Sequence, residues 1–202
     1  MTKYIFDFDG VICNSTNISY EIHNKLAKDY GLKSINNKKE YLKIIDNHNI
    51  ERKIEGKVKD YYSQCNEYYN NNLDNINLYP YIKKTINESK DEIVIITSTY
   101  EEFVHKILKQ CGIEKKLYVI GKSTKGSKPE RLELYLENNK VKKEDIIYIG
   151  DTINDYLFCE KCGIRMIGVN YGYSNLTGIK DRLLYLFNTD KELYEYIKRR
   201  MA

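Results

Sequence analysis

The sequence predicts an α/β fold: a Rossmann-like parallel sheet with helices on both faces, plus a small all-helical cap domain inserted after the first strand. Three observations lead to this prediction. Short runs of almost wholly apolar residues recur, which is typical of strands buried on both faces of a parallel sheet. From residue 91 onward these runs alternate with segments of helical periodicity. Residues 15–90 show helical spacing alone.

The apolar runs are the expected strands. Because successive residues of a strand face opposite sides of a sheet, a continuous apolar run predicts burial on both sides. The strands are expected at residues 3–8, 92–97, 117–120, 146–149, 164–169 and 183–187. The segments between them place apolar residues three and four positions apart, as one face of a helix requires. Helices are expected at residues 101–111, 130–137, 154–162 and 191–200.

The segment between the first two strands has its own helical pattern. Ile18, Ile22, Leu26 and Tyr30 form one apolar stripe, and a Tyr-rich stripe follows between residues 58 and 73. We therefore divide the chain into an α/β core, residues 1–14 and 91–202, and a helical cap domain, residues 15–90.

The composition excludes several classes of protein. Of the 202 residues 31% are charged and 42% hydrophobic, which is typical of a globular chain. The net charge of +4 is small and spread out, so nucleic acid is not an expected partner. The sequence contains no apolar run long enough for a membrane span. An odd number of cysteines, and carboxylates by residue 9 where a secretory signal needs an apolar segment, predict a cytoplasmic protein. Its expected state is a monomer or a homodimer.

Two carboxylates follow the first strand, Asp7 and Asp9 in the sequence Asp-Phe-Asp-Gly. A carboxylate at the end of a buried strand is costly unless something satisfies it, so this pair indicates a metal ligand, a nucleophile, or both. The alternative is a local turn in which the Asp side chains accept hydrogen bonds from the backbone.

Hydroxyl groups and a lysine follow later elements. Thr97 and Ser98 stand at the end of the second expected strand, where hydroxyls and backbone N–H groups suit an anionic oxygen. Their alternative role is to cap the next helix. Lys128 opens a helix, where the positive end of the helix dipole disfavours a cation, so an anion nearby is expected to offset it. The alternative is an ordinary surface lysine.

A second acidic motif follows the fourth expected strand, with Asp151 directly after Gly150 and Asp155 four residues on. Thr152 and Asp155 also have the spacing of a helix capping box, which would explain both residues but not Asp151. Because ligands in open α/β sheets bind beyond the carboxyl ends of the strands, we expect all these motifs to meet there. Four gathered carboxylates require countercharge, which Mg²⁺ and Lys128 would supply. Such a set suits phosphoryl transfer through an aspartyl-phosphate.

These four motifs, in this order, resemble those of the haloacid dehalogenase superfamily. That family carries D-x-D near the N-terminus, a strand ending in Thr or Ser, a Lys, and an acidic G-D-x-x-x-D. The helical insertion and the loop Asn170-Tyr171-Gly172-Tyr173-Ser174 resemble the phosphoglycolate-phosphatase-like and β-phosphoglucomutase-like branch with a helical cap. Val11 and Asn14 depart from the commoner Thr and Asp of the family.

The resemblance implies a role for each motif residue. Asp7 would be the nucleophile that attacks phosphorus, and Asp9 the general acid and base. Thr97, Ser98 and Lys128 would bind the phosphoryl group.

The resemblance also implies a metal, Mg²⁺. Its ligands would be Asp7, the backbone carbonyl of Asp9 and Asp151, while Asp155 would support that shell or bind the ion directly.

The implied activity is that of a phosphatase acting on a small phosphorylated metabolite, since a cap above the site leaves little room for a polymer. Dehalogenation is excluded because it needs neither a second Asp nor a metal. Two alternatives stay open: a sugar phosphomutase of the β-phosphoglucomutase type, and a non-catalytic sensor on the same fold. Arg52 in the cap is a candidate contact for an anionic group of the substrate, or an ordinary solvated residue.

Overall fold

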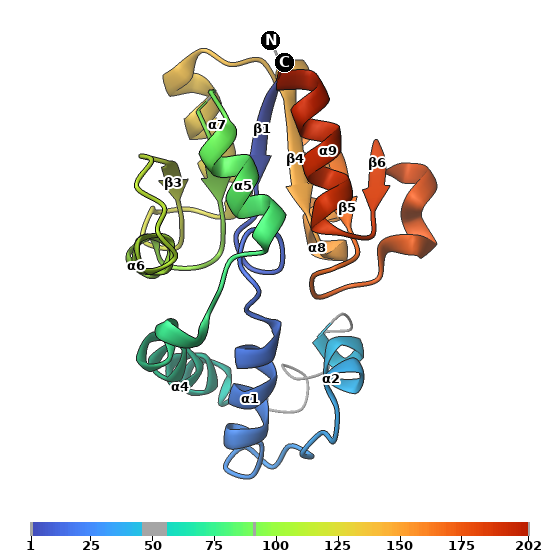
Figure 1. Cartoon of the computed structure of the whole chain (residues 1–202). Helices are drawn as coiled ribbons and strands as arrows, with labels where there is room; N and C mark the ends of the chain where they lie inside the picture. The colour runs from blue at the N-terminus through green and yellow to red at the C-terminus, as the bar shows by residue number, and fades with distance from the viewer. Residues whose placement is uncertain (1, 46–55, 91, 202) are drawn as a thin grey trace.

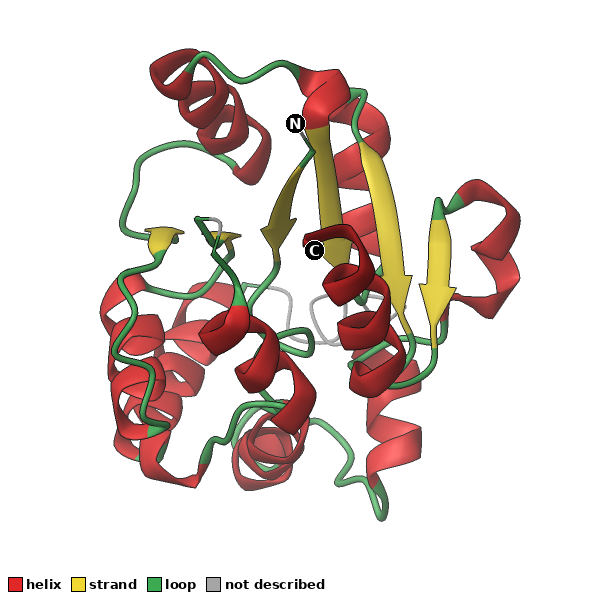
Figure 2. Cartoon of the chain, turned by 45° about the horizontal axis from the view of Figure 1, so that its top comes forward, coloured by secondary structure: helices red, strands yellow, loops and turns green. Residues whose placement is uncertain are grey.

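The computed structural model describes residues 2–45, 56–90 and 92–201. Its centre is a six-stranded sheet in the order β3-β2-β1-β4-β5-β6, in which every neighbouring pair is parallel. The expected parallel α/β sheet is therefore confirmed (Figure 2). The strands are β1 (Lys3–Phe6), β2 (Val94–Ile96), β3 (Tyr118–Ile120), β4 (Ile146–Gly150), β5 (Arg165–Val169) and β6 (Tyr185–Phe187).

Helices cover both faces of this sheet. On one face Phe6 and Ile95 pack in the same apolar cluster as Val104, Ile107 and residues of two further helices. The helices of this face are α5 (Pro80–Glu88), α6 (Glu101–Gln110) and α9 (Asp190–Met201). Because Ile5 and Val94 point the opposite way, they pack on the other face in a second cluster. The helices of that face are α7 (Lys128–Asn139) and α8 (Ile153–Cys162).

The short connections of the core include two 3₁₀ helices, η2 (Lys143–Asp145) and η3 (Leu176–Arg182). Cys159 and Cys162 of α8 are both buried in the second apolar cluster, where they pack as small apolar side chains. No helix among the described residues is long and apolar enough to cross a bilayer.

A helical insertion separates β1 from β2. It contains α1 (Thr16–Ala27), α2 (Lys38–Ile45), α4 (Val58–Asn71) and the 3₁₀ helix η1 (Leu73–Asn75). Figure 1 shows α1, α2 and α4 together beyond the carboxyl ends of the strands. Two chain segments join the insertion to the sheet and are hydrogen-bonded to each other: Asn14 N–H donates to Asn77 O (2.8 Å) and Tyr79 N–H donates to Ile12 O (3.0 Å).

Helix α5 lies with the core, although the expected cap domain, residues 15–90, includes it. It packs beside α9 on the sheet (Figure 1). The Tyr81 N–H donates to the carboxylate of Asp190 (2.8 Å), and Tyr194 donates to Glu88 (2.8 Å). Helical periodicity alone could not separate α5 from the insertion, because an amphipathic helix shows the same pattern on either partner.

Candidate active site

The two acidic motifs meet because β1 and β4 are neighbours in the sheet. Phe6 is paired with Ile149, and the Asp7 N–H donates to Ile149 O (2.9 Å), so Asp7 and Asp151 leave the sheet side by side. Asp155 lies in the first turn of α8, which follows Asp151. One carboxylate oxygen from each of Asp7, Asp151 and Asp155 lies within 4.8 Å of the other two.

Lys128 lies against this acidic group. It opens α7 after Ser127, which caps the helix in a capping box with Glu130. The Lys128 Nζ donates to Asp7 Oδ2 (3.1 Å) and to Asp155 Oδ1 (2.8 Å), and only 15% of its side chain is exposed. Burial alone would lower the pKa of Lys128, but the charges of Asp155 and Asp7 raise it above its ordinary value. The anion that the helix start required is therefore this pair of carboxylates.

Asp155 caps its helix and also belongs to the acidic group. Its Oδ2 accepts from Thr152 Oγ1 (2.6 Å), from Thr152 N–H (3.1 Å) and from Asp151 N–H (3.3 Å). The capping box, which was the alternative interpretation of Thr152 and Asp155, is present beside the acidic group. Burial by itself would raise the pKa of Asp155. The charge of Lys128 and the hydrogen bonds from Lys128 and Thr152 outweigh burial, so the pKa lies below its usual value. Both Asp155 oxygens thus already have donors.

Asp151 is the least satisfied of the three carboxylates. It is fully buried, and its Oδ2 accepts from Tyr173 N–H (2.6 Å). Its Oδ1 is buried and has no hydrogen-bond partner within the described part of the chain. Burial, followed by the charges of Asp155 and Asp7, raises the pKa of Asp151 well above its usual value. Burial likewise raises the pKa of Asp7 to about 7, against the lowering effect of Lys128.

Two glycines allow the backbone to approach the Asp151 carboxylate. Gly10 has a positive φ of 77°, which a side chain would strain, and a Cβ there would lie 2.0 Å from Asp151 Oδ2. A Cβ on Gly172 would lie 2.1 Å from the same oxygen and 2.6 Å from Gly10 O. The loop after β5 is therefore part of this site.

We expect Gly172→Ala to lower the free energy of unfolding by about 2 to 3 kcal/mol, because backbone and a buried carboxylate would both have to move. Urea denaturation measures the change. The matched control is Gly178→Ala, since a Cβ at exposed Gly178 meets no atom within 4 Å. Equal stability of the two variants would contradict the close packing at Gly172.

The carboxylate of Asp9 is turned away from the acidic group. Its Oδ1 accepts from the Tyr69 hydroxyl (2.8 Å), and its Oδ2 accepts from the Thr99 hydroxyl. The sulfur of Cys13 lies 3.5 Å from Oδ1. The four predicted carboxylates therefore form a group of three plus Asp9 beside it.

Thr97 and Ser98 follow β2, next to β1. Thr97 is 1% exposed, and its Oγ1 accepts from Thr99 N–H (3.2 Å). Its carbonyl accepts from the buried guanidinium of Arg131 (3.1 Å). Ser98 is exposed at the turn. The alternative role of helix capping is not observed for either, because α6 begins only at Glu101, after Tyr100.

Several contacts of the site were not predicted. Thr99 belongs to the expected segment Thr97-Ser98-Thr99, but the contact of its hydroxyl with Asp9 was not foreseen. Tyr69 and Tyr173 reach the site from a helix of the insertion and from the loop after β5. Tyr69 stands at helical spacing, and there the sequence carries no signal that separates such a contact from core packing. Tyr173 belongs to the loop 170–174, which the family resemblance included without a role for this residue.

Glu101 holds the loop that leads to Lys128. Its carboxylate accepts from the N–H groups of Gly121 (2.8 Å), Ser123 (2.8 Å) and Thr124 (3.0 Å), and from the Thr124 hydroxyl (2.8 Å). Burial by itself would raise the pKa of Glu101, but these donors lower it to about 2. The donors of this Gly-Lys-Ser-Thr segment are thus directed at a carboxylate of the protein.

Because the folded pKa of Glu101 lies below its unfolded value, its stabilisation is present above about pH 4 and is lost as the pH falls toward 2. We expect Glu101→Gln to lower the free energy of unfolding by about 1 to 2 kcal/mol at pH 7. Urea denaturation between pH 7 and pH 2.5 should show the gap between variant and wild type narrowing in acid. Glu102→Gln, at the neighbouring exposed position, is the control.

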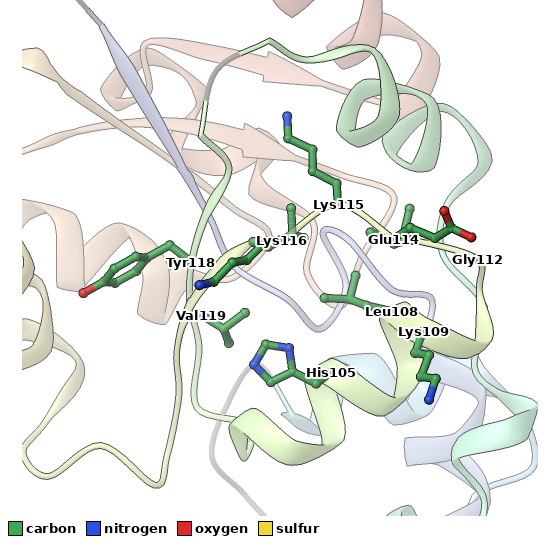
Figure 3. A pocket seen from close by; sticks show the side chains of 11 residues that line it. His105, Leu108, Lys109, Gly112, Glu114, Lys115, Lys116, Tyr118 and Val119 are labelled. Carbon is green, nitrogen blue, oxygen red and sulfur yellow. The ribbon is translucent and has the colours of Figure 1, made fainter.

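A groove of about 740 Å³ lies elsewhere, between α6 and the segment leading into β3. Figure 3 shows His105, Leu108 and Lys109 on the helix and Tyr118 and Val119 across from them. None of the predicted site residues lines this groove. We therefore place the candidate site at the carboxyl ends of β1, β2 and β4.

The fold and the site define an α/β protein with an acidic, lysine-paired centre at the carboxyl ends of its parallel strands. The chain belongs to the family of haloacid dehalogenase-like hydrolases, whose sequence profile matches residues 4–169. The predicted family is confirmed.

Two curated relatives are both named phosphoglycolate phosphatase. The chain is 31% identical over 105 residues to the phosphoglycolate phosphatase of Vibrio parahaemolyticus, covering 48% of this chain and 46% of the relative. It is 29% identical over 128 residues to that of Haemophilus influenzae, covering 59% and 57%. The chain thus spans about half the length of the curated relatives it matches. A crystal structure of a predicted phosphoglycolate phosphatase from Haemophilus somnus has the same fold, with a TM-score of 0.80, 21% identity and 98% of both chains covered.

Proposed function

We propose that this chain is a Mg²⁺-dependent phosphatase that hydrolyses a small phosphomonoester through an aspartyl-phosphate on Asp7. The observation that carries the proposal is the convergence of Asp7, Asp151 and Asp155 within 4.8 Å, with Lys128 paired to two of them. Membership of the haloacid dehalogenase-like hydrolases supports the reaction class.

The acidic group fits a divalent cation. Asp151 Oδ1 is buried without a partner among the described residues, which is costly for a carboxylate unless a cation binds it. Asp7, Asp151 and the backbone carbonyl of Asp9 would hold Mg²⁺, a cation that prefers oxygen ligands. Three donors meet Oδ2 of Asp155 and Lys128 pairs with its Oδ1, whereas each oxygen of Asp7 has one donor. Asp155 therefore supports the site rather than binding the ion. The bound ion would neutralise negative charge on the phosphoryl oxygens.

The side chains of the chain have separate tasks. Asp7 Oδ attacks phosphorus, and Lys128 orients that carboxylate and offsets the charge of the phosphoryl group. Thr97, Ser98 and the N–H groups of their turn contact the phosphoryl oxygens. Asp9 gives a proton to the leaving oxygen and later takes one from the water that hydrolyses the aspartyl-phosphate. Asp9 is suited to this task because its carboxylate stands apart from the acidic group.

The insertion would act as the cap that selects the substrate. Since α5 packs on α9, this division puts the cap at residues 15–78 and the core at 1–14 and 79–202. The relatives named phosphoglycolate phosphatase make phosphoglycolate one candidate among small phosphorylated metabolites. Arg52, the candidate contact for an anionic group of the substrate, lies outside the described residues.

The test is hydrolysis of p-nitrophenyl phosphate by the purified chain, with Mg²⁺, after EDTA, and after Mg²⁺ is added back. Turnover that is lost with EDTA and restored by Mg²⁺ is the expected result. A panel of phosphorylated metabolites, phosphoglycolate included, then identifies the preferred ester. Absence of metal-dependent turnover would overturn the proposal in favour of a sensor, and a requirement for a sugar bisphosphate activator would identify a phosphomutase.

A further inference from the structure

Tyr69 is the point at which the insertion reaches the carboxylate of Asp9. It lies in α4, on the partly buried side of that helix, and its hydroxyl donates to Asp9 Oδ1 (2.8 Å). The other oxygen, Asp9 Oδ2, accepts from the hydroxyl of Thr99, which belongs to the core. The insertion thus supplies the phenol on Oδ1, while the core supplies the Thr99 hydroxyl on Oδ2 and the weaker thiol donor of Cys13, whose sulfur lies 3.5 Å from Oδ1.

The ring of Tyr69 is itself fixed by packing. Its centroid lies 6.1 Å from that of Phe103, a buried residue of α6, and Tyr69 belongs to the edge of the main apolar cluster. The neighbouring Tyr68 differs: its ring faces the ammonium group of Lys25 at 4.2 Å. Two adjacent tyrosines of one helix therefore have different surroundings, and only Tyr69 has a described contact with Asp9.

We infer that Tyr69 is a positioning residue for Asp9, an inference that rests on the proposed phosphatase function. A carboxyl group that transfers a proton must be held in the right orientation, and a single donor leaves its plane free to turn. Donors on both oxygens fix that plane. A phenol and a Thr hydroxyl both donate and accept, so they can hold Asp9 before and after it gives up its proton.

The role of Tyr69 predicts a dependence on the leaving group. In the first step the Asp7 Oδ–P bond forms, the bond between phosphorus and the ester oxygen breaks, and the Asp9 proton moves to that oxygen. An alkyl ester leaves as a strongly basic alkoxide and needs this proton. A p-nitrophenyl ester leaves as a weakly basic phenolate and needs it much less. Loss of positioning should therefore lower the rate of hydrolysis of the alkyl ester more than that of the aryl ester. Loss of folded protein would lower both rates by the same factor.

The experiment compares Tyr69→Phe with the matched control Tyr68→Phe, using the best alkyl phosphate of the metabolite panel and p-nitrophenyl phosphate. We expect Tyr69→Phe to lower kcat/KM for the alkyl ester about tenfold, and for the aryl ester by a clearly smaller factor, since general acid catalysis contributes ~100-fold or more in total. Tyr68→Phe should leave kcat/KM unchanged for both esters. A thermal melt of each variant verifies that it is folded.

A double variant separates this inference from the proposed function. Asp9→Asn alone should show a larger leaving-group selectivity, and adding Tyr69→Phe to it should have no further selective effect, because the group that Tyr69 positions is gone. Equal losses on both esters, or no loss, in Tyr69→Phe would overturn the positioning role while the phosphatase proposal stands. A wild-type chain that hydrolyses neither ester would overturn both.

Discussion

Asp7→Asn is expected to lower kcat for every phosphomonoester about a thousandfold or more, because an amide cannot attack phosphorus as the carboxylate does. The change is nearly isosteric, and the oxygen that remains can keep the hydrogen bond from Phe8 N–H or the one from Lys128, which meet different oxygens of Asp7. It also removes one of three neighbouring carboxylates. The fold should therefore persist while the activity is lost.

The measurement is kcat with Mg²⁺ on the preferred ester and on p-nitrophenyl phosphate, together with a thermal melt. Asp29→Asn, which removes an exposed carboxylate of the insertion, is the matched control and should retain wild-type kcat. A folded Asp7→Asn protein with more than about a tenth of wild-type kcat would assign the nucleophile to another residue.

The core was predictable because its strands are continuous apolar runs. Apolar side chains point to both faces of the strands at Ile93–Ile96 and Ile146–Ile149, which is typical of a parallel sheet covered by helices on both sides. In a parallel sheet the carboxyl ends of the strands lie at the same edge. A polar residue directly after such a run, such as Asp7 or Asp151, must therefore lie at that edge. The convergence of these residues with Lys128 followed from the order of the elements.

The contacts between distant segments could not be predicted in this way. Which oxygen of Asp9 meets Tyr69, or why Gly172 must lack a side chain, depends on how a helix of the insertion and the loop after β5 pack on the site. A single sequence records periodicity within a segment but no register between segments. For the same reason the pattern of α5 did not reveal that it packs on α9 rather than within the insertion.

Asp151→Asn is expected to abolish the stabilisation of the protein by Mg²⁺. An ion that binds only the folded chain stabilises it by about 2.7 kcal/mol at a concentration 100 times its Kd, which for a chain of this size raises Tm by about 5 to 10 °C. The buried Asp151 Oδ1 is the oxygen that lacks any other described partner, so its replacement should remove most of that rise.

In the metal-free state the wild type should no longer be more stable than Asp151→Asn. Burial and the charges of Asp155 and Asp7 make an ionised Asp151 unfavourable, which raises its pKa, and an amide of the same shape avoids this cost while its oxygen still accepts from Tyr173 N–H. Asp151→Asn should therefore melt at or above the wild-type Tm in EDTA and below it in Mg²⁺. Asp181→Asn, at an exposed position of η3, should behave as wild type in both. A Tm of Asp151→Asn that still rises with Mg²⁺ as the wild type does would show that this carboxylate is not a ligand.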